Sequence, residues 1–198
     1  TFVTGANYTS AFTSAPNPES FFEINYVQAT ESLGVNESMH SLTTNLTTGN
    51  WADVVPTNEL LGLYEAADIR RTAAMFAGTK SGEAVVFSRK FPGARGPFTD
   101  NIPVIRFSEV LLIRAEAYAA TGKDDLALVD LNRIRTRAGA TAVAATVKGA
   151  DLIEAIMKER RLELVMEGHR FFDLKRRGQT ITKAGLSAVE IGRASCRE

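Results

Sequence analysis

The residues best suited to chemistry in this sequence are the acidic side chains and the histidine near its C-terminal end. Glu163 and Glu167 are one helical turn apart, His169 lies two residues after Glu167, and Asp173 lies four residues after His169. Paired carboxylates are the catalytic groups of glycosidases, and a Glu-x-x-His spacing on a helix holds di-metal centres. Only one residue separates Glu167 from His169, so this pair does not have the Glu-x-x-His spacing of a di-metal site. The chain also has no His-Glu-x-x-His motif of the kind that binds zinc.

Many basic residues surround these carboxylates, and nearby arginines keep carboxylates ionised rather than raising their pKa. A general acid needs a raised pKa, so the environment does not favour catalysis. We therefore expect no catalytic residue, no metal site and no cofactor, and we interpret the charges as a structural ion-pair network.

The segment 159–177, ERRLELVMEGHRFFDLKRR, alternates charged residues with large apolar ones. Because the apolar side chains turn inward, some charges must be buried with them and must find partners. We expect these pairs to cross between helices. The predicted pairs join Glu109 or Glu116 to arginines at four positions, namely Arg133, Arg160, Arg161 and Arg170.

The first half of the chain carries twelve of the sixteen aromatic residues. Sugar rings have apolar C–H faces that pack on aromatic rings, while amides and carboxylates bind the hydroxyl groups. Trp51 lies beside Asn50 and close to Asp53, and Tyr8 lies between two polar residues. We predict that Trp51, Tyr8, Asn50 and Asp53 bind a ligand, which requires the rings to be partly exposed.

The alternative for Trp51 is an anchor that packs on the scaffold, since tryptophans are highly buried on average. Five phenylalanines lie among apolar neighbours, and we expect them in the core. They are Phe21, Phe22, Phe107, Phe171 and Phe172.

These candidates need a scaffold, and the second half supplies one. The apolar spacing predicts helices over 107–122, 124–139 and 151–166 and a short helix over 171–176. The first two resemble a tetratricopeptide hairpin. We predict a mostly α fold with a tetratricopeptide-like helical scaffold, long loops and a minor β element. Since repeat helices need neighbours to bury their faces, we expect the isolated chain to be marginally stable.

The first half favours irregular structure, because it is rich in Thr, Ser, Asn, Gly and Pro. Short strands are predicted over 20–26 and 84–91, a long loop over 29–54, and a helix capped by Thr57. We divide the chain into a loop-rich and aromatic-rich part, 1–105, and a helical scaffold of the same domain, 106–189.

The composition limits the partners. The net charge of the 198 residues is +0, which gives no reason to expect nucleic acid as a partner.

The last residues, 191–198, read IGRASCRE and match the translation of a sequencing adapter, so we interpret 190–198 as an artefact. The sole cysteine, Cys196, lies there. Deleting 191–198 is expected to change stability by no more than about 0.5 kcal/mol.

Several motifs taken together resemble the SusD/RagB family. They are PTNELL at 56–61, DIRR at 68–71, NIPVIR at 101–106 with SEVLLIRAEA at 108–117, ERRLEL at 159–164 and EGHRFFDLKR at 167–176. The resemblance implies the C-terminal part of a glycan-binding or nutrient-binding lipoprotein of the outer membrane. Such a protein faces the cell exterior and is lipid-anchored through an N-terminus that lies outside this chain.

By the same resemblance, the protein binds an oligosaccharide, delivers it to a TonB-dependent SusC-like transporter and performs no chemistry. The alternative is a tetratricopeptide-type adaptor for a protein or peptide, which would have more repeats. A glycoside hydrolase is the third class, and turnover of any glycan would support it.

Overall fold

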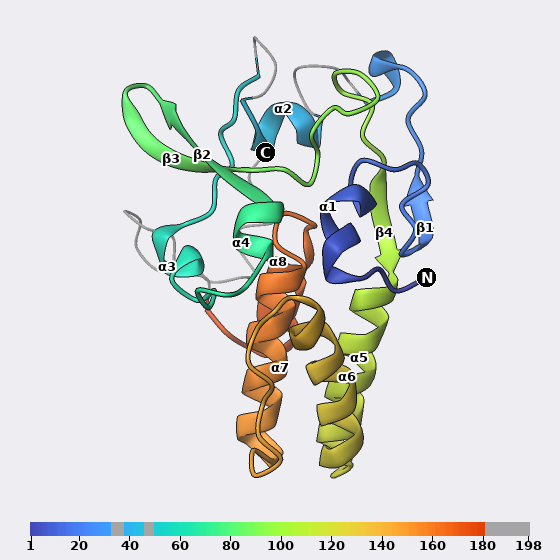
Figure 1. Cartoon of the computed structure of the whole chain (residues 1–198), viewed down its shortest axis with the longest axis vertical. Coiled ribbons are helices and arrows are strands. Elements are labelled where there is room, and N and C mark those ends of the chain that lie inside the picture. The colour runs from blue at the N-terminus through green and yellow to red at the C-terminus, as the bar shows by residue number, and fades with distance from the viewer. Residues whose placement is uncertain (33–37, 46–49, 181–198) are drawn as a thin grey trace.

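The computed structural model describes residues 1–32, 38–45 and 50–180, and within these ranges the chain is mostly helical with two small sheets. Figure 1 shows the long helices in the lower half and the strands and short helices above them. The long helices are α5 (Phe107–Ala120), α6 (Asp124–Arg137), α7 (Gly149–Glu163) and the shorter α8 (His169–Arg176). The predicted fold class is confirmed.

The first half contributes short elements. Its helical turns are η1 (Gly5–Asn7), α1 (Tyr8–Ala11), η2 (Ala29–Ser32), α2 (Met39–Thr43), α3 (Asn58–Leu61) and α4 (Arg70–Ala73). The strands are β1 (Ser20–Ile24), β2 (Met75–Lys80), β3 (Glu83–Ser88) and β4 (Ile102–Arg106). Antiparallel pairing joins β1 to β4 and β2 to β3. The part predicted to be irregular therefore contains α1, and the predicted loop over 29–54 contains η2 and α2.

Local sequence explains where the long helices begin and end. The backbone of Arg106 is still extended and α5 starts at the next residue. Gly122 adopts φ +73°, and the amide of Lys123 donates to the carbonyl oxygen of Tyr118 at 2.8 Å, which closes the end of α5. Asp124 and Asp125 then occupy the first turn of α6, where the helix dipole favours negative charge.

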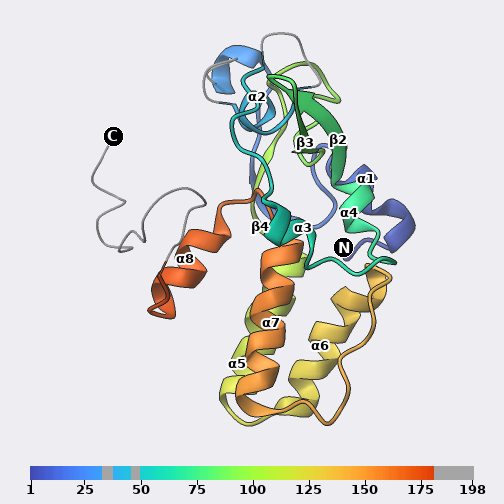
Figure 2. The ribbon, with the colours of Figure 1, turned by 90° about the vertical axis from the view of Figure 1, so that its left-hand side faces the viewer.

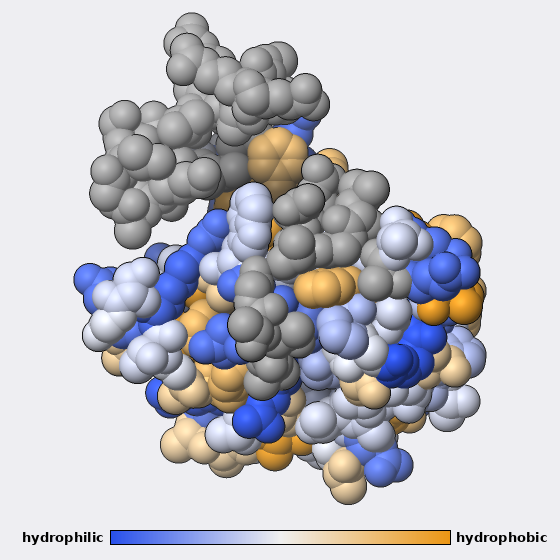
Figure 3. Space-filling view, turned by 90° about the horizontal axis from the view of Figure 1, so that it is seen from above, coloured by the Kyte–Doolittle hydropathy of each residue, from blue (hydrophilic) through white to orange (hydrophobic). Residues whose placement is uncertain are grey.

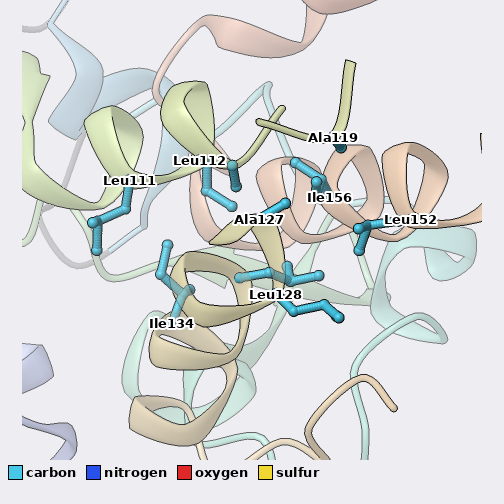
Figure 4. Packing of buried hydrophobic residues seen from close by; sticks show 10 residues of the cluster. Leu111, Leu112, Ala119, Ala127, Leu128, Ile134, Leu152 and Ile156 are labelled. Carbon is cyan, nitrogen blue, oxygen red and sulfur yellow. The ribbon is translucent and has the colours of Figure 1, made fainter. Parts of the chain in front are cut away.

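The main core lies where α5, α6 and α7 meet. Leu112 of α5, Leu131 of α6 and Ile156 of α7 have no solvent exposure. In Figure 4 the side chains from the three helices point toward one another, and alanines such as Ala119 and Ala127 are among them. The core therefore fixes the three helices as one unit beneath the sheets, and Figure 2 shows α8 set to one side of them.

Other apolar side chains of the same helices face outward. Val110 and Ile113 of α5 and Leu126 and Val129 of α6 are all exposed. In the part of the chain that the structure describes, no helix is long and apolar enough to cross a bilayer. Uncovered helix faces agree with the marginal stability expected of the isolated chain, which stays a prediction.

The predicted core included three phenylalanines that the structure places outside it. Phe21, Phe22 and Phe172 are 64%, 58% and 66% exposed. Phe107 and Phe171 are partly buried. On the short, bulged strand β1, two consecutive residues both face solvent, which a regular alternation of faces would not allow. The predicted artefact at 190–198 lies outside the described residues.

Candidate functional site

Glu163 is the centre of a network of buried charges. Its carboxylate lies 3.1 Å from Nη1 of Arg70, 2.8 Å from Nη1 of Arg106 and 2.6 Å from Nη2 of Arg137. Those arginines come from α4, β4 and α6, and the Glu163 side chain has no exposure. The predicted structural network of buried ion pairs is therefore present.

The network continues to both sides of Glu163 along the chain. Glu167 accepts bonds from Nε of Arg106 at 2.6 Å and from Nζ of Lys90 at 2.5 Å. Lys90 also donates to the main-chain carbonyl of Glu163 at 2.6 Å. One turn earlier, Glu159 pairs with Arg70 at 2.6 Å. The segment 159–177, called the signature segment below, therefore joins the helices to the strand-bearing half.

The electrostatic environment keeps these carboxylates ionised. Burial would raise the pKa of Glu163, but the attraction of Arg137, Arg106 and Arg70 outweighs it and holds that pKa well below its usual range. The pKa of Glu167 is also lowered, because Arg106 and Lys90 outweigh its burial. Neither group is a proton donor at neutral pH. The described residues contain no group of three or more His, Cys, Asp or Glu side chains that could hold a metal ion.

The predicted partners of Glu109 and Glu116 were wrong. Glu116 pairs with Arg176 at 2.5 Å and Glu109 lies 3.3 Å from Nδ1 of His169, so both reach toward α8. Three of the four predicted arginines have other contacts. Arg160 pairs with Asp173, Arg161 pairs with Glu59, and Arg133 lies over the rings of Phe2 and Phe107. Long side chains reach neighbours that helical spacing alone does not identify.

The segment that carries Trp51 is fixed through its backbone. The amide of Ala52 donates to the carbonyl of Ser41 at 2.8 Å, and the amide of Val54 donates to the carbonyl of Leu42 at 2.9 Å. Ala52 is buried, whereas the Trp51 side chain is 50% exposed. Trp51 therefore presents its ring to solvent from a fixed main chain, as a stacking residue must.

The two polar neighbours of Trp51 differ in their surroundings. The amide of Asn50 donates to the carbonyls of His40 at 3.3 Å and Thr44 at 3.0 Å, which makes it part of the loop's internal bonding. Asp53 is exposed and forms an ion pair with Lys80, at the end of β2. Lys80 also donates to the carbonyl of Ala52 at 3.1 Å. The structure thus brings Lys80 to the chain segment that carries Trp51 and Asp53.

Sequence reasoning missed Lys80, which lies 27 residues from Asp53. The strand β2 that carries it was not predicted, because MFAGTK contains a glycine and has a weak alternating pattern. Seen from above in Figure 3, hydrophilic and hydrophobic residues are interspersed over the visible surface at this end of the molecule.

Tyr8 does not meet the requirement for exposure. It is 1% exposed and packs in a second apolar cluster with Leu60, Tyr64 and Met75. Burial raises the pKa of its hydroxyl well above the usual value, and the charge of Glu163 adds to this effect. Because its ring offers no free face, we do not retain Tyr8 as a ligand-stacking residue.

Comparison with known proteins gives consistent matches. The model of the SusD family matches residues 92–191. The starch-binding protein SusD of Bacteroides thetaiotaomicron is 41% identical over 90 residues, which cover 46% of this chain and 15% of that protein. A SusD-like protein of Formosa agariphila is 27% identical over 159 residues, or 64% of this chain and 31% of its own length.

Solved structures agree with the sequence matches. A SusD-like carbohydrate-binding protein from Bacteroides vulgatus superposes with a TM-score of 0.76 at 26% identity, covering 92% of this chain and 39% of that one. A SusD superfamily protein from Bacteroides thetaiotaomicron gives 0.77 at 26% identity, covering 98% and 46%. The chain spans less than half the length of each of these relatives.

Proposed function

Because the chain belongs to the SusD family, we propose that the full-length protein that carries it captures oligosaccharides at the cell surface. It then passes them to a TonB-dependent SusC-like transporter in the outer membrane. A lipid anchor at an N-terminus outside this chain would hold the protein on the outer face. The names of two similar proteins, one starch-binding and one carbohydrate-binding, support the ligand class.

The observation that carries the proposal is the Trp51 ring, half exposed on a backbone that is bonded to the α2 segment. A fixed aromatic face loses little conformational entropy on binding and packs against the C–H face of a sugar. Asp53, two residues after Trp51, and its partner Lys80 supply a charged acceptor and a donor for hydroxyl groups. Asn50 stays in the proposal as the residue that shapes the loop.

The network of buried ion pairs supports binding without chemistry. The buried carboxylates of the signature segment are held in ion pairs, namely Glu159, Glu163, Glu167 and Asp173. A substrate could not reach them without breaking the network. These features support a binding protein rather than a glycoside hydrolase, and the family match favours glycan capture over a tetratricopeptide-type adaptor.

The test is a glycan-array screen of the full-length protein, followed by calorimetric titration with the best ligand. Trp51→Ala is expected to weaken binding by about 1–3 kcal/mol, the usual effect of removing an aromatic anchor. Phe172→Ala is the matched control, because Phe172 is also an exposed aromatic residue but lies on α8. Equal affinities for wild type and Trp51→Ala would identify Trp51 as a structural anchor. Turnover of the glycan would exclude pure binding.

A further inference from the structure

A groove lies between α3 and the turn that joins α7 to α8. Its volume is about 350 Å³, within the range of roughly 300–1,000 Å³ that is common for small-molecule sites. The lining combines apolar and cationic side chains, among them Leu60, Leu164, Phe171, Arg160, Arg161 and Arg170. The groove therefore suits a ligand that has both an apolar face and a negative charge.

Arg160, which lines the groove, has a buried hydrogen-bond donor without an acceptor among the described residues. Its side chain is 5% exposed, and its Nε donates to the two carboxylate oxygens of Asp173 at 3.2 and 3.0 Å. Its buried Nη1 has no hydrogen-bond partner in the part of the chain that the structure describes. A buried donor of a cation is costly to leave unpaired, so an acceptor at this position would stabilise the site.

Arg170 adds positive charge that the groove itself does not balance. Its side chain is exposed, and among the described residues no ion pair joins it to a carboxylate. Partial burial is the largest cause that lowers the pKa of Arg170, and the neighbouring Arg161 adds to it, while the charges of Asp173, Glu59 and Glu154 act in the opposite direction. Arg161 itself is paired with the exposed Glu59 at 2.8 Å. Of the side chains that line the groove, Asp173 alone is acidic among the described residues.

The N-terminal end of α8 also favours an anion in the groove. Its N-cap residue is Gly168, at φ +82°, and no side chain caps the helix. The first helical residues, 169–171, line the groove. The first amides of a helix lack partners within the helix, and the positive end of the dipole attracts anions. Two independent features, the helix start and the unpaired Nη1 of Arg160, thus favour an anion at one place.

We propose that this groove binds the carboxylate of an acidic sugar, with the sugar ring against Leu60, Leu164 and Phe171. Guanidinium groups match carboxylates with two parallel hydrogen bonds, and a sugar ring supplies the apolar face. The part of the proposal that concerns an oligosaccharide rests on the proposed function.

The groove also lies close to Trp51 along the chain. Val55, which lines it, is four residues from Trp51, so their Cα atoms are at most about 14 Å apart at ~3.5 Å per residue. An oligosaccharide that stacks on Trp51 can therefore place one of its own acidic sugar units in the groove. This would make the protein selective for uronate-containing glycans over neutral glycans of the same length.

The test is calorimetric titration of the full-length protein with glucuronate, with glucose, and with a uronate-containing oligosaccharide and its neutral counterpart. We expect glucuronate to bind more tightly than glucose, and the acidic oligosaccharide more tightly than the neutral one. Arg170→Gln removes an unpaired cation and is expected to weaken binding of both acidic ligands about tenfold or more. Binding of the neutral oligosaccharide is expected to stay unchanged.

Lys175→Gln is the matched control, because Lys175 is an exposed cation of the same helix that does not line the groove. It is expected to leave all four affinities unchanged, and thermal melts will show whether either variant alters the fold. Raising the salt concentration should weaken binding of the acidic ligands selectively, since screening acts on the charge.

The outcomes separate the two proposals. Equal affinity for glucuronate and glucose, or equal effects of the two substitutions, would overturn the anion site while leaving the role of Trp51 intact. Glucuronate binding that depends on Arg170, without binding of any oligosaccharide, would support the groove and reject glycan capture. A crystal structure of the full-length protein in which one of its own carboxylates occupies the groove would also overturn the proposal.

Discussion

Arg70 and Glu159 face each other with 2.6 Å between Nη1 and Oε1, and neither side chain has any exposure to solvent. They lie 89 residues apart in the sequence. Two ions that are fully removed from water need charged partners, because an isolated buried charge costs several kcal/mol. Arg70 also pairs with Asp68 and Glu163, and Glu159 also pairs with Arg135. The pair is one edge of the network around Glu163, so that network determines how the protein responds to mutation and to pH.

Removing the central charge is expected to be severely destabilising. Glu163→Gln leaves Arg70, Arg106 and Arg137 without the carboxylate that they share. The expected loss is about 3–5 kcal/mol in the free energy of unfolding, measured by urea denaturation near neutral pH. Glu59→Gln, at the exposed pair with Arg161, serves as the control and is expected to leave the midpoint unchanged. Similar midpoints for both variants would contradict the structural importance of the network.

The pH dependence of stability follows from the lowered pKa values of Glu163 and Glu167. A carboxyl group whose pKa is lower in the folded state stabilises the fold above its unfolded pKa, which is about 4.3 for Glu. That stability is lost as the pH falls through the folded-state pKa. The melting temperature should therefore be nearly constant down to about pH 5 and should fall at lower pH.

Calorimetric scans across this range provide the measurement. In Glu163→Gln one of the two groups can no longer titrate, so the fall below about pH 5 should be shallower than in the wild type. An equally steep fall in this variant would mean that other carboxyl groups dominate acid unfolding.

Two glycines with the same backbone angle should differ in their tolerance of a side chain. Gly122 and Gly139 both have φ +73°, but a Cβ on Gly139 would lie 2.8 Å from the carbonyl oxygen of Ala67, whereas one on Gly122 would meet nothing within 4 Å. Gly122→Ala is expected to cost about 1 kcal/mol, from the left-handed conformation alone. Gly139→Ala should cost clearly more, because the backbone at Ala67 must also move.

Thermal or urea unfolding of the two variants measures the difference directly. Equal losses would show that the chain near Ala67 adapts without cost.

The helical half of the fold was predictable because its signals are local. Apolar spacing, the acidic first turn of α6 and the positive φ of Gly122 are all properties of neighbouring residues. The Thr57 cap was found for the same reason, since its side chain accepts a bond from the amide of Leu60 at 3.2 Å. The strand at 20–24 likewise falls within the predicted range 20–26, and the strand at 83–88 overlaps the predicted range 84–91.

The parts that were not predictable depend on contacts between distant segments. The pairing of β1 with β4 joins residues about eighty positions apart, and the exposure of Phe21 follows from that bulged pairing. Burial of charge in the signature segment was foreseen, but the partners of Glu163 come from three separate elements. At the candidate site, a ligand-binding role for Trp51 required partial exposure of its ring, and the ring is half exposed. The contribution of Lys80 was not predicted, because the strand β2 that carries it has a weak alternating pattern.

Glu163 also bears on how the molecule opens in its native state. Because its carboxylate holds guanidinium groups from α4, β4 and α6 at once, none of these segments can detach alone without breaking a buried ion pair with Glu163. Local fraying is thereby suppressed across elements that are otherwise separated in the chain. Their amide hydrogens should exchange with solvent together, as a single cooperative unit, while the exposed end of the β2–β3 hairpin exchanges independently.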